Sequence, residues 1–139
     1  MKKVATFGVF DLIHVGHVKF LEECKKLFKD CKLIVVLARD STVEREKGRR
    51  PLMNERERRV IVSALKPVDE VILGKEGKDK LKIVEEIKPD VIVLGYDQTW
   101  DEEELKKELE KRGLKVEIIR LKKYAETSSS RIRAKLNED

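Results

Sequence analysis

The sequence predicts an α/β fold in which a five-stranded parallel sheet is covered by helices on both faces. Short apolar runs alternate with segments whose apolar residues recur at helical spacing along the 139 residues. Two of these runs, residues 32–38 and 90–94, are apolar almost throughout, as strands buried on both faces are. Strands joined through helices form right-handed βαβ units. The expected architecture is therefore Rossmann-like and doubly wound, with strand order 3-2-1-4-5.

The first third of the chain is expected to form a strand, a helix, a second strand and a short helix. A strand over residues 3–7 leads through a turn into a helix that ends near residue 29. The apolar run 32–38 forms the second strand. Asp40 or Ser41 can cap the short helix that follows it.

The middle of the chain contains start and stop signals for a helix. Asn54 and Glu57 have the spacing of a capping box, and Pro67 ends the helix that the box begins. A short third strand follows over residues 69–73. The side of this helix that we expect to be buried carries Val60, Ile61, Ala64 and Leu65.

The last third repeats the alternation of helix and strand. Helices that end before Pro89 and at Gly113 precede the fourth strand, 90–94, and the fifth, 115–119. The fifth strand alternates in polarity and is expected at an edge of the sheet. A last helix is expected to begin at Thr127.

The composition limits the class of protein. Charged residues make up 42% and aromatic residues 5%, so the core must be aliphatic. The net charge of +5 is mild and the signs are interleaved, so a bound nucleotide accounts for local basic clusters as well as a nucleic acid would. Without a signal peptide or a membrane-length apolar run, we expect one cytoplasmic domain over residues 1–139 and no membrane partner. Many charges with few amides are typical of a thermophile.

Two further classes of function are disfavoured. Cys24 and Cys31 do not form a C-x-x-C pair, so the chain has neither a zinc knuckle nor a redox motif, and Cys24 is expected to pack as a small apolar residue. An RNA-binding protein would need aromatic residues interleaved with its basic ones, and the basic loop has none. We therefore expect no nucleic-acid partner.

The stretch TFGVFDLIHVGH, residues 6–17, is the centre of the functional hypothesis. It passes from strand to helix, with Gly8 before the turn and His14 and His17 three residues apart at the helix start. The unpaired N–H groups of a helix N-terminus attract phosphate, and two imidazoles there can stabilise charge on a phosphoryl group. The alternative is that both histidines are only polar residues at a helix start. It is disfavoured because the glycine, strand and helix context all match a phosphate site.

This stretch resembles the HxGH signature of the nucleotidylyltransferase superfamily, in its cytidylyltransferase branch. The usual form is G-T-F-D-x-x-H-x-G-H, and this chain departs from it by a valine in place of the threonine. The resemblance implies that both histidines are catalytic and bind nucleotide. It also assigns to the nucleotide site Gly8, Val9 and Phe10, and to the acceptor-substrate site Asp11.

Two basic residues are implied to hold phosphates and are counted as catalytic. Lys47 belongs to the basic loop 47–51, which reaches the nucleotide phosphates in the superfamily, although a solvated charge run gives the same pattern. Arg58 belongs to an E-R pair like that of the family. It is implied to clamp the phosphates with a bidentate fork, unless it only forms a surface ion pair.

Two later segments resemble the rest of the family's site. Gly95 and Asp97 match a G-x-D element, in which the glycine allows close approach to a ligand and the aspartate contacts nucleotide or acceptor, helps a metal, or only forms a turn. Tyr96 and Trp100 can stack on a flat acceptor, although Trp100 can instead simply cover apolar surface. The family's S-T-T/S-x-I element, implied to hold a nucleotide base or phosphate, is matched by Thr127, Ser128, Ser129 and Ser130.

The resemblance implies nucleotidyl transfer, in which a phosphate oxygen of an acceptor attacks the α-phosphorus of a nucleoside triphosphate and pyrophosphate leaves. The attacking phosphate is already anionic near neutral pH, so the protein needs to supply position and charge stabilisation, not a base. Mg²⁺ or another divalent cation is expected as cofactor, carried more by the substrate than by the protein, so no metal ligands are assigned. A homodimer is expected, since dimers are common in this family.

Several segments resemble archaeal FAD synthases more than glycerol-3-phosphate cytidylyltransferases: residues 38–40, 47–51, 65–69 and 94–98. FAD synthases join AMP from ATP to FMN, so the expected substrates are ATP and FMN. One alternative is transfer from CTP to glycerol 3-phosphate. Another is a non-catalytic nucleotide-binding regulatory module, which the two intact histidines disfavour.

Overall fold

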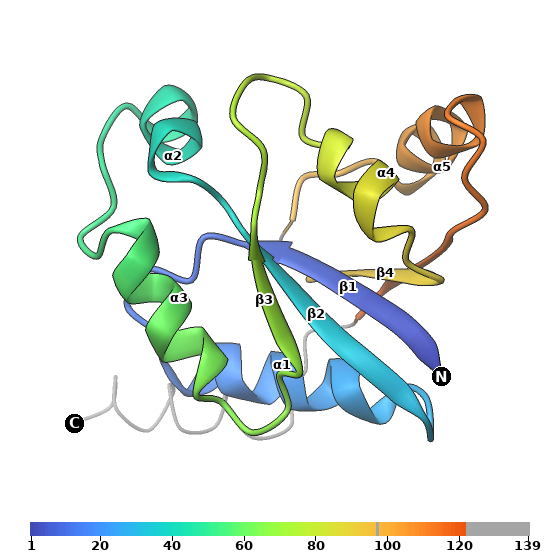
Figure 1. Cartoon of the computed structure of the whole chain (residues 1–139), viewed down its shortest axis with the longest axis horizontal. Coiled ribbons are helices and arrows are strands. Elements are labelled where there is room, and N and C mark those ends of the chain that lie inside the picture. Colours follow the sequence, from blue (N-terminus) through green and yellow to red (C-terminus); the bar gives the residue numbers. More distant parts are fainter. Residues whose placement is uncertain (97, 122–139) are drawn as a thin grey trace.

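Five parallel strands form the sheet that was predicted (Figure 1). The structure, a computed structural model, describes residues 1–96 and 98–121. The strands run in the order β3-β2-β1-β4-β5, which confirms the predicted topology and the edge position of the fifth strand. Their bounds are β1 Lys2–Gly8, β2 Cys31–Leu37, β3 Glu70–Leu73, β4 Val91–Leu94 and β5 Glu117–Arg120.

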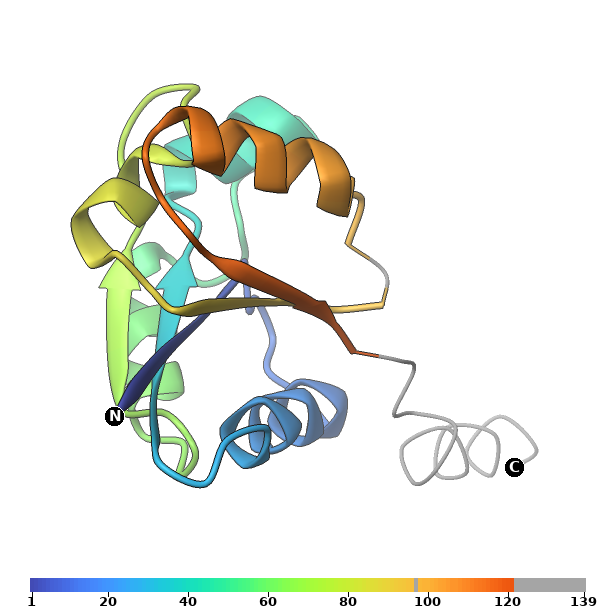
Figure 2. The same ribbon diagram turned by 90° about the vertical axis from the view of Figure 1, so that its right-hand side faces the viewer.

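Helices cover both faces of this sheet (Figures 1 and 2). One layer contributes Leu21 and Val62 to the core on its face, and the other contributes Val84 and Leu109 to the core on the opposite face. The first layer consists of α1 (Val15–Lys26) and α3 (Glu55–Ser63), and the second of α4 (Lys82–Ile87) and α5 (Glu102–Lys111). A further helix, α2 (Asp40–Lys47), follows β2 directly.

The alternation of side chains along each strand explains the two cores. Successive residues of a strand point to opposite faces. Val4 of β1 therefore belongs to the first core and Ala5 to the second, and Val35 and Val36 of β2 divide in the same way. Both faces of β2 and β4 are buried along nearly their whole length, which is why their sequences are almost entirely apolar.

The strand register aligns the carboxyl ends from which the predicted site loops depart. Gly8 pairs with Leu37, and Leu37 pairs with Leu73. The pairing continues past the strands, because the Ala38 N–H donates to the Gly8 carbonyl at 3.0 Å and the Gly74 N–H to the Leu37 carbonyl at 2.8 Å. Ligands bind at this edge in sheets of this type, so the loops that carry the predicted site residues depart from the edge where a ligand is expected.

The prediction that Asp40 or Ser41 caps α2 is wrong. The N-cap residue is Arg39, which makes no side-chain capping bond, and Asp40 is already helical. By contrast, the capping box of α3 is confirmed, since the Asn54 side chain accepts from the Glu57 N–H at 2.9 Å and the reciprocal bond is present.

The predicted buried side of α3 is wrong for two residues. Val60 is 70% exposed and Ala64 is also exposed, whereas the fully buried positions are Arg58 and Val62. Leu65 packs against the same core as expected. The helix is rotated about its axis relative to the prediction, because the buried Arg58 occupies its inward face and sequence periodicity counts arginine as a polar residue.

Cys24 is fully buried in the first core, as expected, and burial raises the pKa of its thiol. No helix within residues 1–96 and 98–121 is long and apolar enough to cross a membrane. The helix predicted from Thr127 lies outside the described residues.

Candidate active site

The two histidines lie side by side at the start of α1. His14 is the N-cap residue, and its Nδ1 accepts a hydrogen bond from the Gly16 N–H at 3.0 Å. The Nδ1 of His17 accepts from the His14 N–H at 3.2 Å, so the pair forms a capping box. Their ring centroids are 4.0 Å apart. Two imidazoles therefore occupy a helix N-terminus together, as the three-residue spacing predicted.

These hydrogen bonds determine which ring nitrogen carries the proton. An Nδ1 that accepts from a backbone N–H cannot itself be protonated, so each neutral ring carries its proton on Nε2. The first turn of α1 contains no acidic residue, and His14 is exposed. The helix start thus offers imidazole N–H donors together with its own partial positive charge, a combination suited to a phosphoryl group.

Phe10 supports the turn that precedes the histidines. Its φ of 51° is left-handed, its side chain is 5% exposed, and its ring centroid lies 5.2 Å from that of His17. A Cβ on Gly8 would come within 2.5 Å of the Phe10 ring. Gly8 is therefore required to admit this ring, a packing role that the sequence did not reveal. Contacts of these residues with a nucleotide stay predictions.

Arg58 lies fully buried beneath the same turn. Its Nη1 donates to the carbonyls of Val9 at 2.9 Å and Ala38 at 2.8 Å. Its Nε donates to the Met53 carbonyl at 3.1 Å, and its Nη2 pairs with Asp40 at 2.7 Å. One guanidinium therefore joins the ends of β1 and β2, the start of α2 and the loop before α3.

This position rules out the surface ion pair for Arg58, whereas its contact with phosphates stays a prediction. A fully buried side chain forms no surface ion pair. A bidentate contact with a phosphate would have to break hydrogen bonds that the buried guanidinium already makes, which is costly. In this structure Arg58 orders the backbone at Val9, in the turn that leads to His14.

An acidic pair that the sequence did not reveal joins the starts of α2 and α3. The Asp40 N–H donates to the Glu55 carboxylate at 2.9 Å, and the Glu55 N–H donates to the Asp40 carboxylate at 3.2 Å. Arg39 adds an ion pair with Glu55 at 3.1 Å. Each carboxylate lies in the first turn of its own helix and satisfies an N–H of the other. The only feature of the sequence that could have indicated this pair is the presence of an acidic residue at the start of both helices.

Asp11 connects the histidine turn to the loop before α3. Its two carboxylate oxygens accept from the N–H groups of Leu52 at 2.8 Å and Met53 at 3.0 Å. Burial raises the pKa of the Asp11 carboxyl, but the two N–H donors and the charges of Arg58 and Arg49 together lower it, and its pKa lies below the ordinary value. The carboxylate thus has a structural task in addition to the acceptor contact that was predicted.

Lys47 is the last residue of α2, not part of the loop as predicted. Gly48 ends the helix with a φ of 74°, a left-handed conformation that suits glycine. The Lys47 side chain is exposed and makes no ion pair with any residue that the structure describes. Its charge is thus available at the surface.

The loop after β4 is held by two residues that sequence reasoning missed. Gln98 accepts from the Gly95 N–H at 2.8 Å and donates to the Phe7 carbonyl at 3.0 Å, which ties this loop to the end of β1. Arg120 donates to the carbonyls of Gly95 and Gln98, each at 2.9 Å. Tyr96 is 40% exposed. The predicted site residues outside the described ranges are Asp97, Thr127, Ser128, Ser129 and Ser130.

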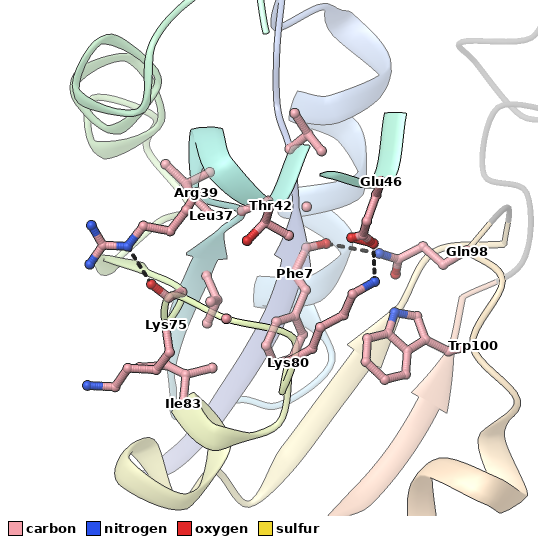
Figure 3. A pocket seen from close by; sticks show the side chains of 16 residues that line it. Phe7, Leu37, Arg39, Thr42, Glu46, Lys75, Lys80, Ile83, Gln98 and Trp100 are labelled. Atoms are coloured by element: carbon pink, nitrogen blue, oxygen red, sulfur yellow. Dashed lines mark hydrogen bonds and ion pairs between the residues drawn. The ribbon is translucent and has the colours of Figure 1, made fainter. Parts of the chain in front are cut away.

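A cavity of about 170 Å³ lies at the carboxyl ends of the strands (Figure 3). It is lined by Gly8 and Val9, at the start of the turn that leads to the histidines, and by Trp100, but by neither histidine. Trp100 also packs against the core under α4 and α5 and so covers apolar surface, whereas its stacking on an acceptor stays a prediction. The cavity therefore lies next to the histidine turn without including the imidazoles.

Comparison with known proteins agrees with this geometry. The sequence profile of the cytidylyltransferase-like family matches residues 5–135. The chain belongs to this family. An FAD synthase of Aciduliprofundum boonei is 54% identical over 91% of this chain and 83% of its own length. An FAD synthase of Thermoplasma volcanium is 48% identical over 99% of this chain and 96% of its own length.

The fold of this cytidylyltransferase-like protein also has a solved counterpart. A structure described as a lipopolysaccharide core biosynthesis protein from Thermoplasma volcanium GSS1 has a TM-score of 0.82 and 49% identity, and covers 89% of this chain and 98% of its own. These similarities extend over nearly the whole chain. They confirm the family resemblance that the HxGH stretch indicated.

Proposed function

We propose that this chain is an FAD synthase, a nucleotidyltransferase that joins AMP from ATP to FMN and releases pyrophosphate. The observation that carries the proposal is an identity of about half with proteins named FAD synthase, over most of both lengths. The paired imidazoles at the start of α1 support the same reaction class, since they suit a reacting phosphoryl group.

The reaction needs little chemistry from the protein. A phosphate oxygen of FMN forms a bond to the α-phosphorus of ATP, and the bond from that phosphorus to the bridging oxygen of the β-phosphate breaks. The second pKa of a phosphate monoester is about 6, so the attacking oxygen is ionised near neutral pH and no general base is required. The protein aligns the two substrates and stabilises the charge that develops on the phosphoryl oxygens.

His14 and His17 are the residues to which we assign that stabilisation. Both rings carry their protons on Nε2, which makes this nitrogen the donor toward phosphoryl oxygens. Lys47, exposed at the end of α2, is proposed to attract the departing pyrophosphate. Arg58 contributes through the backbone that it orders.

Mg²⁺ is proposed to enter with the phosphates of ATP. Among the described residues, no group of three His, Cys, Asp or Glu side chains is arranged to hold a metal ion. A cation held mainly by substrate phosphates fits such a donor set, because Mg²⁺ is commonly bound through phosphates and water. It would neutralise part of the phosphate charge.

The decisive assay presents the purified chain with Mg-ATP and FMN and measures FAD by chromatography and pyrophosphate release. We expect stoichiometric FAD and pyrophosphate. CTP with glycerol 3-phosphate is the matched alternative, and turnover of that pair alone would replace FAD synthase by glycerol-3-phosphate cytidylyltransferase. Binding of ATP without turnover of either pair would instead identify a regulatory module.

A homodimer is also proposed, on the family resemblance alone. Light scattering coupled to gel filtration would give twice the mass of the chain if the proposal is correct. A single-chain mass at micromolar concentration would exclude it under assay conditions.

A further inference from the structure

The cavity beside the histidine turn has mainly apolar walls. Phe7 comes from the end of β1, Ile83 from α4 and Trp100 from the loop after β4 (Figure 3). Its volume of about 170 Å³ exceeds that of an apolar protein cavity of ~150 Å³ that admits a benzene ring. The cavity therefore has room for a single six-membered ring of a larger flat system, and an apolar lining suited to it.

Thr42 supplies an unused polar group in this lining. The residue lies on α2 and is 9% exposed, and its side chain is among those that form the cavity wall (Figure 3). Its hydroxyl makes no hydrogen bond with any described residue. Buried polar groups are nearly always paired, so this hydroxyl indicates a ligand with a polar atom at this point.

The rim of the cavity carries charge. Lys80, in the loop after β3, forms an ion pair with Glu46 of α2, and its Nζ lies 5.6 Å from the centroid of the Trp100 ring. Both charged side chains are partly exposed. The opening thus places the Lys80 cation beside the indole ring of Trp100.

We propose that this cavity binds the isoalloxazine ring of FMN, with Trp100 against the ring, the Thr42 hydroxyl bonded to its polar end and Lys80 at the rim. The inference rests on the proposed function. The flavin ring combines an apolar dimethylbenzene end with a polar pyrimidine-dione end, which matches an apolar wall that contains one unpaired hydroxyl. Adenine fits less well, because its nitrogen atoms surround the whole ring.

The position of the cavity relative to the histidines supports the same occupant. Gly8 and Val9 line the cavity, and the chain continues directly from them into the turn that carries His14. An acceptor whose ring lies in the cavity can extend its ribityl phosphate along this segment toward the helix N-terminus. There the phosphate would meet the α-phosphorus of ATP.

FMN binding without ATP is the direct test, followed through the quenching of flavin fluorescence. Thr42→Val removes the hydroxyl at constant shape, and we expect FMN to bind on the order of 10-fold more weakly. Trp100→Leu should weaken binding at least as much and reduce the quenching. Steady-state kinetics should show a raised KM for FMN in both variants and an unchanged KM for ATP.

Two exposed positions give matched controls. Thr99→Val repeats the threonine change next to Trp100. Lys80→Met removes the cation at the rim and should also weaken FMN binding, and Lys82→Met is its control, since neither Thr99 nor Lys82 lines the cavity. Both control variants should bind FMN like the unaltered chain. If Trp100→Leu fails to fold, as judged by circular dichroism, the isosteric Thr42→Val variant decides.

The outcomes separate this inference from the proposed function. Normal FAD synthesis with unchanged FMN affinity in Thr42→Val and Trp100→Leu would overturn the cavity assignment and leave the function intact. A raised KM for ATP in place of FMN would assign the cavity to adenine and equally overturn it. Tight FMN binding that these variants weaken, without FAD formation, would support the cavity and contradict the function.

Discussion

At the scale of single residues, His14 has two roles, helix capping and proposed donation to phosphate, and substitutions of this residue can separate them. His14 caps α1 through Nδ1 and is proposed to donate to phosphate through Nε2. Asparagine is a good N-cap residue but has no group that reaches as far as Nε2. Variants at this position therefore distinguish helix stability from charge stabilisation.

We predict that His14→Asn keeps the thermal stability of the chain and lowers kcat by about 10²-fold or more, as loss of a preorganised donor does. His14→Ala should lose the same activity and also the cap, which is worth about 1 kcal/mol. Calorimetry and FAD formation measure the two effects. A near-normal kcat in His14→Asn would remove this ring from the chemistry. His17→Ala should likewise lower kcat by about 10²-fold.

Arg58 is predicted to act on stability as well as on activity. Arg58→Lys keeps the charge, but an ammonium group cannot reach all four oxygen atoms to which the planar guanidinium donates. The ion pair with Asp40 is therefore weakened, and two of the three backbone carbonyls lose their hydrogen bond. We expect a loss of about 3–5 kcal/mol in the free energy of unfolding, measured with urea.

The matched control for Arg58 is its exposed neighbour, since Arg59→Lys should change stability by less than ~0.5 kcal/mol. Activity measured in the fraction of Arg58→Lys that remains folded should fall in kcat more than in the KM for ATP. A raised KM for ATP alone would instead indicate direct phosphate contact.

Among the elements, the strand-to-helix turn depends on the fit between Gly8 and Phe10. Gly8→Ala brings a methyl group against the ring and should destabilise the chain by about 1–3 kcal/mol. Adding Phe10→Leu removes the atoms in conflict, so the double variant should recover part of that loss. Urea unfolding measures both. Equal stability of the single and double variants would contradict the packing explanation.

Asp11 tethers the histidine turn to the loop before α3, and the stability that its hydrogen bonds contribute should depend on pH. The Asp11 pKa is lowered in the folded chain, so its contribution to stability is present above the ordinary Asp pKa of about 3.9 and is lost as the pH falls through the lowered value. Asp11→Asn should remove this contribution, which we place on the order of 1 kcal/mol.

The measurement is the free energy of unfolding between pH 2 and 7, as a difference between Asp11→Asn and the unaltered chain. That difference should shrink as the pH falls below about 3.9. Asp30→Asn, at an exposed carboxylate, is the control and should show little change. A difference that stays constant with pH would mean that the tether does not depend on the charge of Asp11.

For the molecule as a whole, the sheet order was predictable because it follows from few rules. Alternating strands and helices with right-handed connections predict a doubly wound parallel sheet, and 3-2-1-4-5 is the order of the Rossmann-like form of such sheets. The side of α3 was not predictable in the same way. Its inward face carries Arg58, and hydrophobic periodicity has no means to assign a charged residue to a core.

The candidate site likewise has one part that the sequence predicts and one part that only the tertiary structure determines. The histidine pair depends on residues three apart, and helix geometry alone fixes such neighbours, so the motif was sufficient to bring the rings together. The partners of Arg58 include Val9, which is 49 positions away, and the cavity combines segments from both halves of the chain. Contacts at that separation exist only after the sheet has assembled, because local backbone preferences carry no information about which distant carbonyl or ring will be adjacent.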